Sequence, residues 1–225
     1  MGVALSALRT EIRERCDQEN SDFISDSELN SYINASYGEL YDLLVSKMEE
    51  YFITSTTFTV ASGASSQALP SGFYKIRGVD RSIGGAYIPV RKFNFAQRGQ
   101  DTVLRVFDTQ NPSVTYRTMG QTIYFEPPSA APGDYRVWYV PQRTVLSDNA
   151  DETADGVIDD WREFIVVDAC IKCMLKEESD ASGFMALKQQ QLARIEAVAQ
   201  NRDVSEPDQV TDIRRVGLGY LGGPA

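Results

Sequence analysis

The sequence predicts an α+β fold: a four-helix bundle made of an N-terminal and a C-terminal helix pair, with an inserted antiparallel β barrel or sandwich. Apolar residues recur every three or four positions near both ends of the 225-residue chain, as on one face of a helix. Between about residues 53 and 143 they alternate with polar residues, as in strands. We therefore expect a helical domain of residues 1–52 and 144–202, a β domain of residues 53–143 and an extended C-terminal tail of residues 203–225.

The two predicted N-terminal helices follow from apolar spacing and from a capping pattern. The first helix ends near Gln18, and its apolar stripe consists of Leu5, Leu8, Ile12 and Cys16. Ser25 and Glu28 then form a capping box, in which the hydroxyl accepts from the Glu28 amide and the Glu28 carboxylate reaches back to the Ser25 amide. The second helix extends from this box to about Glu50.

Seven short strands are predicted in the middle of the chain. There, β-branched and aromatic residues alternate with polar ones between turns rich in Gly, Pro, Ser and Asn. The predicted strands are residues 56–60, 73–79, 86–90, 103–107, 114–117, 122–125 and 135–140. Strands of this number and spacing indicate an antiparallel barrel or sandwich.

Two further helices are predicted after the acidic stretch 148–155. The first, residues 161–175, is apolar nearly all round, and a helix without a polar side favours burial on more than one side. In a chain of this size, a neighbouring subunit is a candidate for the second surface. The predicted subunit contacts on this helix are Phe164, Val167 and Ile171. The last helix spans about residues 182–202.

The net charge of −10 is unevenly distributed along the chain. Residues 1–52 carry 4 basic and 11 acidic side chains, residues 53–143 carry 10 and 5, and residues 144–225 carry 8 and 16. Acidic, basic and acidic blocks therefore follow one another, which bears on partners and association rather than on fold. Arg91 and Lys92 of the basic block are further predicted subunit contacts.

We predict no catalytic residue, no cofactor and no metal site. The chain contains no histidine, which is the usual general base at neutral pH and the commonest zinc ligand. Cys170 and Cys173 have C-x-x-C spacing, but Cys16 is the third and last cysteine, and a structural zinc needs four ligands. Buried core thiols are the favoured interpretation.

Acidic residues around the start of the third predicted helix imitate two metal sites without completing either. Asp151 begins a stretch similar to a calcium loop, but the twelfth position is Arg162 instead of a glutamate. Asp159, Asp160 and Glu163 could hold magnesium in a nuclease, but neighbouring positions on a helix point in different directions. An exposed acidic connection leading into a helix N-terminus explains the same residues.

The layout and two motifs resemble the head-to-tail adaptor proteins of tailed phages. The first motif is Phe23-Ile24-Ser25-Asp26-Ser27-Glu28-Leu29 running into Tyr32-Ile33-Asn34 and Tyr37-Gly38-Glu39-Leu40-Tyr41. The second is the closing strand Tyr135-Arg136-Val137-Trp138-Tyr139-Val140-Pro141 with the amphipathic helices after it. With these motifs the chain is similar to podovirus connector and tail tubular A-type proteins.

This resemblance implies a structural virion protein at the neck, assembled in the host cytoplasm, and not an enzyme. It implies a homo-oligomeric ring, commonly of twelve copies, bound to the portal on one side and to tail or nozzle proteins on the other. Genome DNA would pass through the lumen without sequence-specific binding. The tail would dock on the portal, with predicted contacts Arg214, Arg215, Val216, Leu218 and Tyr220.

Alternatives remain open at the level of sequence. Acidic helices lining the lumen would repel phosphate and let DNA slide, but the basic region could instead contact DNA. Another neck component, such as a head-completion or stopper protein, and a metal-dependent phage nuclease are the other candidates. No run approaches the roughly 20 apolar residues that span a bilayer, and no signal peptide is evident, so we expect no membrane association.

Overall fold

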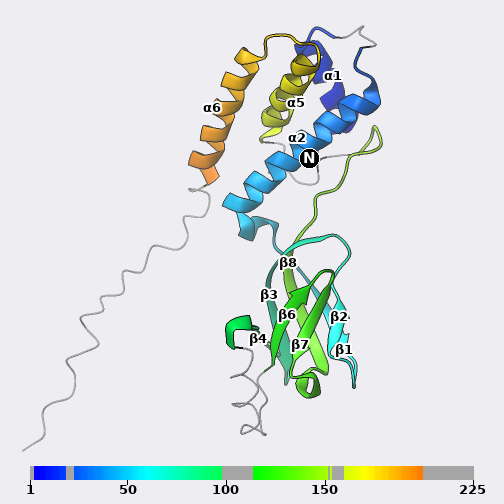
Figure 1. The fold of residues 1–225 in the computed structure, drawn as a ribbon, viewed down its shortest axis with the longest axis vertical. Coiled ribbons are helices and arrows are strands. Elements are labelled where there is room, and N and C mark those ends of the chain that lie inside the picture. The colour runs from blue at the N-terminus through cyan, green and yellow to red at the C-terminus, as the bar shows by residue number, and fades with distance from the viewer. Residues whose placement is uncertain (1–2, 19–22, 98–113, 152, 154–159, 200–225) are drawn as a thin grey trace, which may run out of the picture.

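The computed structural model describes residues 3–18, 23–97, 114–151, 153 and 160–199 (Figure 1). It is a mixed α+β fold in which the helices gather at one end of the long axis and the strands at the other. We call these parts the helical layer and the β module. Each has its own cluster of buried apolar side chains.

The helical layer contains four α-helices among the described residues. Their bounds are α1 (Leu5–Arg15), α2 (Asp26–Lys47), α5 (Arg162–Lys176) and α6 (Ser182–Ala199), and a 3-10 turn, η1 (Glu49–Phe52), follows α2. Helix α5 packs against all three of the others, whereas α6 packs chiefly against α5. The predicted four-helix bundle is therefore not supported in its details, because α5 acts as a hub instead of one of four equivalent members.

The predicted cap of α2 is half confirmed. Ser25 Oγ accepts from the Glu28 amide at 3.3 Å, as expected for an N-cap. The Glu28 carboxylate, however, accepts from Lys176 Nζ at 2.5 Å and from the Tyr32 hydroxyl at 2.9 Å. Glu28 thus ties α2 to the end of α5, because a lysine from the partner helix offers a charged donor that the Ser25 amide does not.

The β module consists of two four-stranded sheets. The first has the order β1 (Thr54–Val60), β8 (Gly133–Pro141), β3 (Phe73–Ile83) and β4 (Ala86–Pro89). The second has the order β2 (Ser66–Ala68), β7 (Thr122–Glu126), β6 (Thr115–Met119) and β5 (Arg91–Lys92). Short 3-10 turns lie at η2 (Phe95–Gln97) and η3 (Pro128–Ala130). All pairings are antiparallel except β5 with β6.

The two sheets enclose one apolar core and do not close into a barrel over the described residues. Phe58, Phe125 and Tyr135 stack within this core, with ring centroids of Phe125 and Tyr135 4.1 Å apart. The chain passes from β1 to β2 and from β4 to β5 without a ladder joining either pair. The barrel alternative is therefore wrong for these residues, and the strand predicted at 103–107 lies outside them.

Two connections position the β module beneath the helical layer (Figure 1). One is η1 leading into β1, and the other is the segment that follows β8. Tyr41 on α2 donates its hydroxyl to the Pro141 carbonyl at 2.5 Å. Asn34 on α2 pairs with both backbone groups of Leu146, at 2.8 and 2.9 Å. Side chains of α2 thus hold the returning chain in place.

Candidate functional site

The basic residues of the β module divide into those held within the chain and those left free. Arg117 lies over the rings of Phe93 and Tyr124, and Arg136 lies 3.6 Å from the Tyr87 ring centroid. Arg81 donates to the Pro132 carbonyl at 2.9 Å. These three arginines are therefore used to hold strands together. They are poor candidates for DNA contacts.

Arg91 and Lys92, the two residues of β5, are exposed, and their predicted role as subunit contacts stays a prediction. Neither forms an ion pair with any residue of the described ranges. Residues Lys75 and Arg77 of β3, by contrast, approach Glu49 at 3.1 Å and Glu50 at 3.7 Å. In the described β module, β5 therefore carries two exposed basic side chains without an ion pair.

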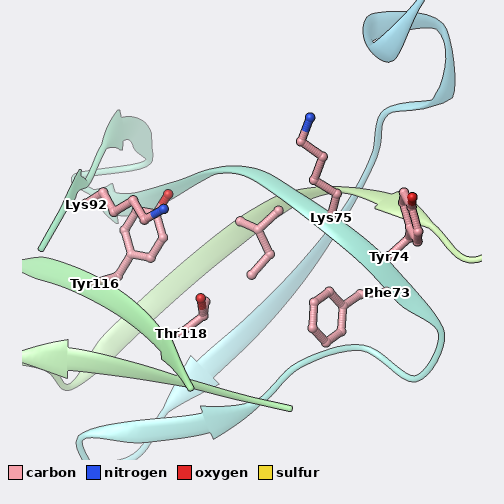
Figure 2. A pocket seen from close by; sticks show the side chains of 7 residues that line it. Phe73, Tyr74, Lys75, Lys92, Tyr116 and Thr118 are labelled. Atoms are coloured by element: carbon pink, nitrogen blue, oxygen red, sulfur yellow. The ribbon is translucent and has the colours of Figure 1, made fainter. Parts of the chain in front are cut away.

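A shallow cavity of about 270 Å³ opens between β3 and the second sheet (Figure 2). Aromatic and lysine side chains dominate its lining, which consists of Phe73, Tyr74, Lys75, Ile76, Lys92, Tyr116 and Thr118. Burial raises the pKa of the Tyr116 hydroxyl, so this group is a neutral donor at physiological pH. The lining offers no paired acid and base. Its chemistry fits contact with another chain better than catalysis.

The helical layer contains a buried ionic cluster that the sequence analysis missed. Asp168 on α5 is only 4% exposed and accepts from Lys172 and, at 2.8 Å, from Lys188 of α6. Lys172 also donates to Ser36 of α2 at 2.8 Å. Lys188 reaches Glu39 of α2 at 2.7 Å. One carboxylate thus connects three helices.

The electrostatics of this cluster favour its charged form. Burial is the largest influence on Asp168 and raises its pKa, but hydrogen bonds from Lys172, Lys188 and Ser36 outweigh it, and the net pKa is lowered. Burial likewise lowers the pKa of Lys188, but its bonds to Asp168 and Glu39 raise it above the usual value overall. Every charge in this cluster has a partner, and its bonds link α2, α5 and α6. We call this cluster the ionic lock.

The three cysteines are buried together between α1 and α5, as expected for core thiols. The hydrogen bond with Cys170, followed by burial, raises the pKa of Cys16 to about 12, against a lowering bond with Cys173. The bond with Cys16 and burial also raise the pKa of Cys173. Thiols with raised pKa values are poor nucleophiles and poor metal ligands. No group of three or more metal-binding side chains occurs in the described part of the chain.

The predicted contacts on α5 lie inside the chain. Phe164 belongs to the main helical core, while Val167 and Ile171 pack with Ala181 in a smaller cluster, and all three are buried. Packing on α1, α2 and α6 explains why α5 is apolar nearly all round. Within one copy these three side chains have little or no exposed surface. Their role in contacts between subunits stays a prediction.

Other predicted positions lie outside the described residues. These are the portal contacts Arg214, Arg215, Val216, Leu218 and Tyr220, together with Asp159 of the acidic pair. Asp151 is described, and its carboxylate accepts from the amides of Ser147 at 2.6 Å and Asp148 at 2.8 Å. The Asp151 carboxylate therefore stabilises the turn, and this role explains an acidic residue at position 151 without a calcium ion.

Exposed apolar side chains mark surfaces that the sequence analysis did not single out. On the β3–β4 hairpin they are Ile83, Tyr87 and Ile88, and on the helices they are Leu175, Met185, Leu187 and Val198. A weak signal was available in the sequence, because residues of the last helix are apolar on more than one face. Exposed apolar patches of this kind are typical of surfaces that contact another protein.

The chain belongs to the SU10 adaptor protein family, whose family model matches residues 3–212. No curated protein matches the chain. Membership supports the expectation of a phage adaptor with a structural role, and it implies a virion component. Among the described residues, no helix is both long and apolar enough to cross a membrane.

Proposed function

We propose that this chain is the head-to-tail adaptor of a tailed phage. It forms a homo-oligomeric ring of twelve copies between the portal and the tail or nozzle proteins. The observation that carries the proposal is the adaptor-family match over nearly the whole chain. The free basic pair at β5 and the exposed apolar hairpin add surfaces suited to protein contacts. The similarity to podovirus adaptors belongs to this proposal.

In this proposal the domains have separate tasks. The helical domain, residues 1–52 and 144–202, is the rigid body, and the inserted β domain, residues 53–143, makes lateral and tail-side contacts. The buried Asp168 cluster supports a rigid role, since it ties α2, α5 and α6 together. The tail, residues 203–225, docks on the portal through the contacts predicted from sequence.

Genome DNA passes through the lumen of the proposed ring without sequence-specific binding. Residues 1–52 and 144–225 are strongly acidic, and acidic walls repel phosphate and reduce adhesion. The arginines of the β module that stack on aromatic rings are already occupied within the chain. This charge distribution favours a sliding surface over a DNA-binding one.

The proposal is tested with the portal protein of the same phage. Full-length chain should bind purified portal and give a ring in images of the complex, and deletion of residues 203–225 should reduce portal binding about tenfold or more. The matched control replaces the same residues by a Gly/Ser segment of equal length. Association with the tail side alone, without portal binding, would identify another neck component and overturn the adaptor assignment.

A further inference from the structure

We infer that the first sheet of the β module continues from one copy to the next, with the β4 edge of each subunit pairing antiparallel with the β1 edge of its neighbour. This inference rests on the proposed ring and names the surface that closes it. Two copies joined by different edges form a heterologous contact, which generates a ring when the rotation closes. The occupant of each edge is therefore a second copy of this chain.

Both edges of the first sheet are open among the described residues. Strand β4 pairs only with β3, and β1 pairs only with β8. Figure 1 shows β4 on one flank of the β module and β1 with β2 on the other. All four residues of β4 are exposed, and four of the seven residues of β1 are exposed too. Each copy thus offers two different edges, facing opposite ways.

The directions of the strands make the two edges compatible. Every pairing in the order β1, β8, β3, β4 is antiparallel, so β1 and β4 run in opposite directions. When a second copy stands beside the first in the same orientation, its β1 meets β4 antiparallel. Because the sheet has an even number of strands, neighbouring copies in the same orientation can continue the antiparallel order of strand directions from one copy to the next.

The β1 edge also lacks the usual protection against pairing, and the β4 edge has only its terminal proline and its short length. Natural edge strands carry charges, proline or bulges that prevent association. Strand β1, of sequence TSTTFTV, contains no charge and no proline. Strand β4 ends in Pro89, but its side chains Tyr87 and Ile88 are 37% and 48% exposed. Pairing would bury these apolar groups.

The backbone of β4 has groups available for a partner strand. Val90 donates its amide to the Val79 carbonyl at 2.7 Å, so alternate residues Ala86 and Ile88 also face β3. Tyr87 and Pro89 therefore turn their backbone groups toward the open edge. A neighbouring strand can exchange two hydrogen bonds with Tyr87 and donate a third to the Pro89 carbonyl.

Charge is complementary at one end of the inferred contact. In an antiparallel pair, the end of β4 lies beside the start of the neighbour's β1. Arg91 and Lys92 follow β4 after Val90 and have no ion-pair partner in the described part of the chain. Glu50, four positions before Thr54, has a side chain that is 76% exposed and lies 3.7 Å from Arg77. It is the acidic group best placed to meet Arg91.

The first test replaces Tyr87, with mass photometry of the full chain over a range of concentrations as the measurement. Tyr87→Pro removes the outward amide without breaking a bond to β3, and should raise the concentration for half-assembly about tenfold or more. Tyr87→Thr also loses the aromatic side chain, but it keeps the backbone amide and introduces a β-branched residue that favours strands. It should therefore assemble at a concentration nearer that of the wild type. Circular dichroism confirms that both variants fold.

The second test exchanges charges. Arg91→Glu alone and Glu50→Lys alone should each weaken assembly about three- to tenfold, because like charges then face one another. An equimolar mixture should assemble again, because every contact in an alternating ring joins opposite charges. A mixture that assembles no better than either variant overturns the charge pairing.

The outcomes separate this inference from the proposed function. Rings that form equally well from Tyr87→Pro overturn the β4–β1 contact and leave the adaptor ring standing. A wild-type chain that stays monomeric in solution and yet forms a portal-bound ring insensitive to Tyr87→Pro overturns the contact as well. Absence of any ring, alone or on the portal, overturns the proposed function itself.

Discussion

The helical layer and the β module differ in how their charged side chains are used. In the helical layer, charged side chains are paired across helices, as in the cluster around Asp168 and the bond between Glu28 and Lys176. In the β module, two sheets have open edges, and Arg91 and Lys92 have no ion-pair partner in the described part of the chain. The contrast teaches that ion pairs link the helices to one another, while the β module has strand edges and basic side chains suited to a neighbour.

The chain offers a way to measure the two parts separately. It has two tryptophans, Trp161 buried in the helical layer and Trp138 on β8 of the β module. Trp161→Phe and Trp138→Phe each leave one fluorescent reporter. Urea unfolding of these single-tryptophan chains therefore follows one region at a time.

The largest expected effect on the free energy of unfolding is that of truncating a buried phenylalanine in either core. Phe164→Ala should lower the free energy of unfolding reported by Trp161 by about 3–5 kcal/mol, because a fully buried ring leaves a cavity. Phe125→Ala, the same change in the β core, should act mainly on Trp138. Equal losses at both tryptophans for both variants would show that the chain unfolds as one unit, and the contrast between regions would then not extend to stability.

Breaking the ionic lock should have the next largest effect. Asp168→Asn keeps the shape but removes the charge that Lys172 and Lys188 share, and should cost about 2–3 kcal/mol at pH 7 in urea unfolding. The control is Glu163→Gln, which breaks the more exposed pair with Arg15 and should cost less than about 1 kcal/mol. Similar losses for both variants would contradict the lock.

The pH dependence gives this lock a second measurement. The pKa of Asp168 is lowered in the folded state, so its charge stabilises the fold above the ordinary aspartate pKa, and this contribution is lost as pH falls through the lowered value. The difference in stability between wild type and Asp168→Asn should therefore be constant from about pH 7 to pH 5 and shrink below about pH 4. A constant difference down to pH 2 would contradict it.

A smaller effect is expected from a polar group in the aromatic core of the β module. The Tyr135 hydroxyl donates to the buried Ala131 carbonyl at 2.7 Å. Tyr135→Phe removes this bond and should cost about 1–2 kcal/mol in unfolding followed by Trp138. The control is Tyr139→Phe, on the same strand but less buried, which should cost less.

The smallest effect is that of the helix cap. Ser25→Ala removes the acceptor for the Glu28 amide and should cost about 1 kcal/mol, measured through Trp161. Ser31→Ala is the matched control inside α2, where alanine is a better helix former and no loss is expected. A loss at Ser31 as large as that at Ser25 would mean that the cap contributes nothing specific.

The candidate surface was predictable only in part. Arg91 and Lys92 were singled out from the charge pattern of the sequence, and the structure places both at the surface, while their role as subunit contacts stays a prediction. Strands β2 and β5 were not predicted, because segments of three and two residues are too short to show an alternating pattern. The open edge of β4 depends on which strands pair, and this information is not local.

The sequence by itself determined the elements whose causes are local. Apolar spacing set the helices, alternation set the longer strands, and Ser25 set the start of α2. Tertiary structure decided the rest, because it depends on contacts between segments far apart in the chain. Asp168 becomes a lock only when Lys188 folds back beside it, and α5 is apolar all round because α1, α2 and α6 surround it. The two sheets stay open over the described residues for the same reason: pairing between distant strands, not the pattern of any one strand, decides whether a barrel closes.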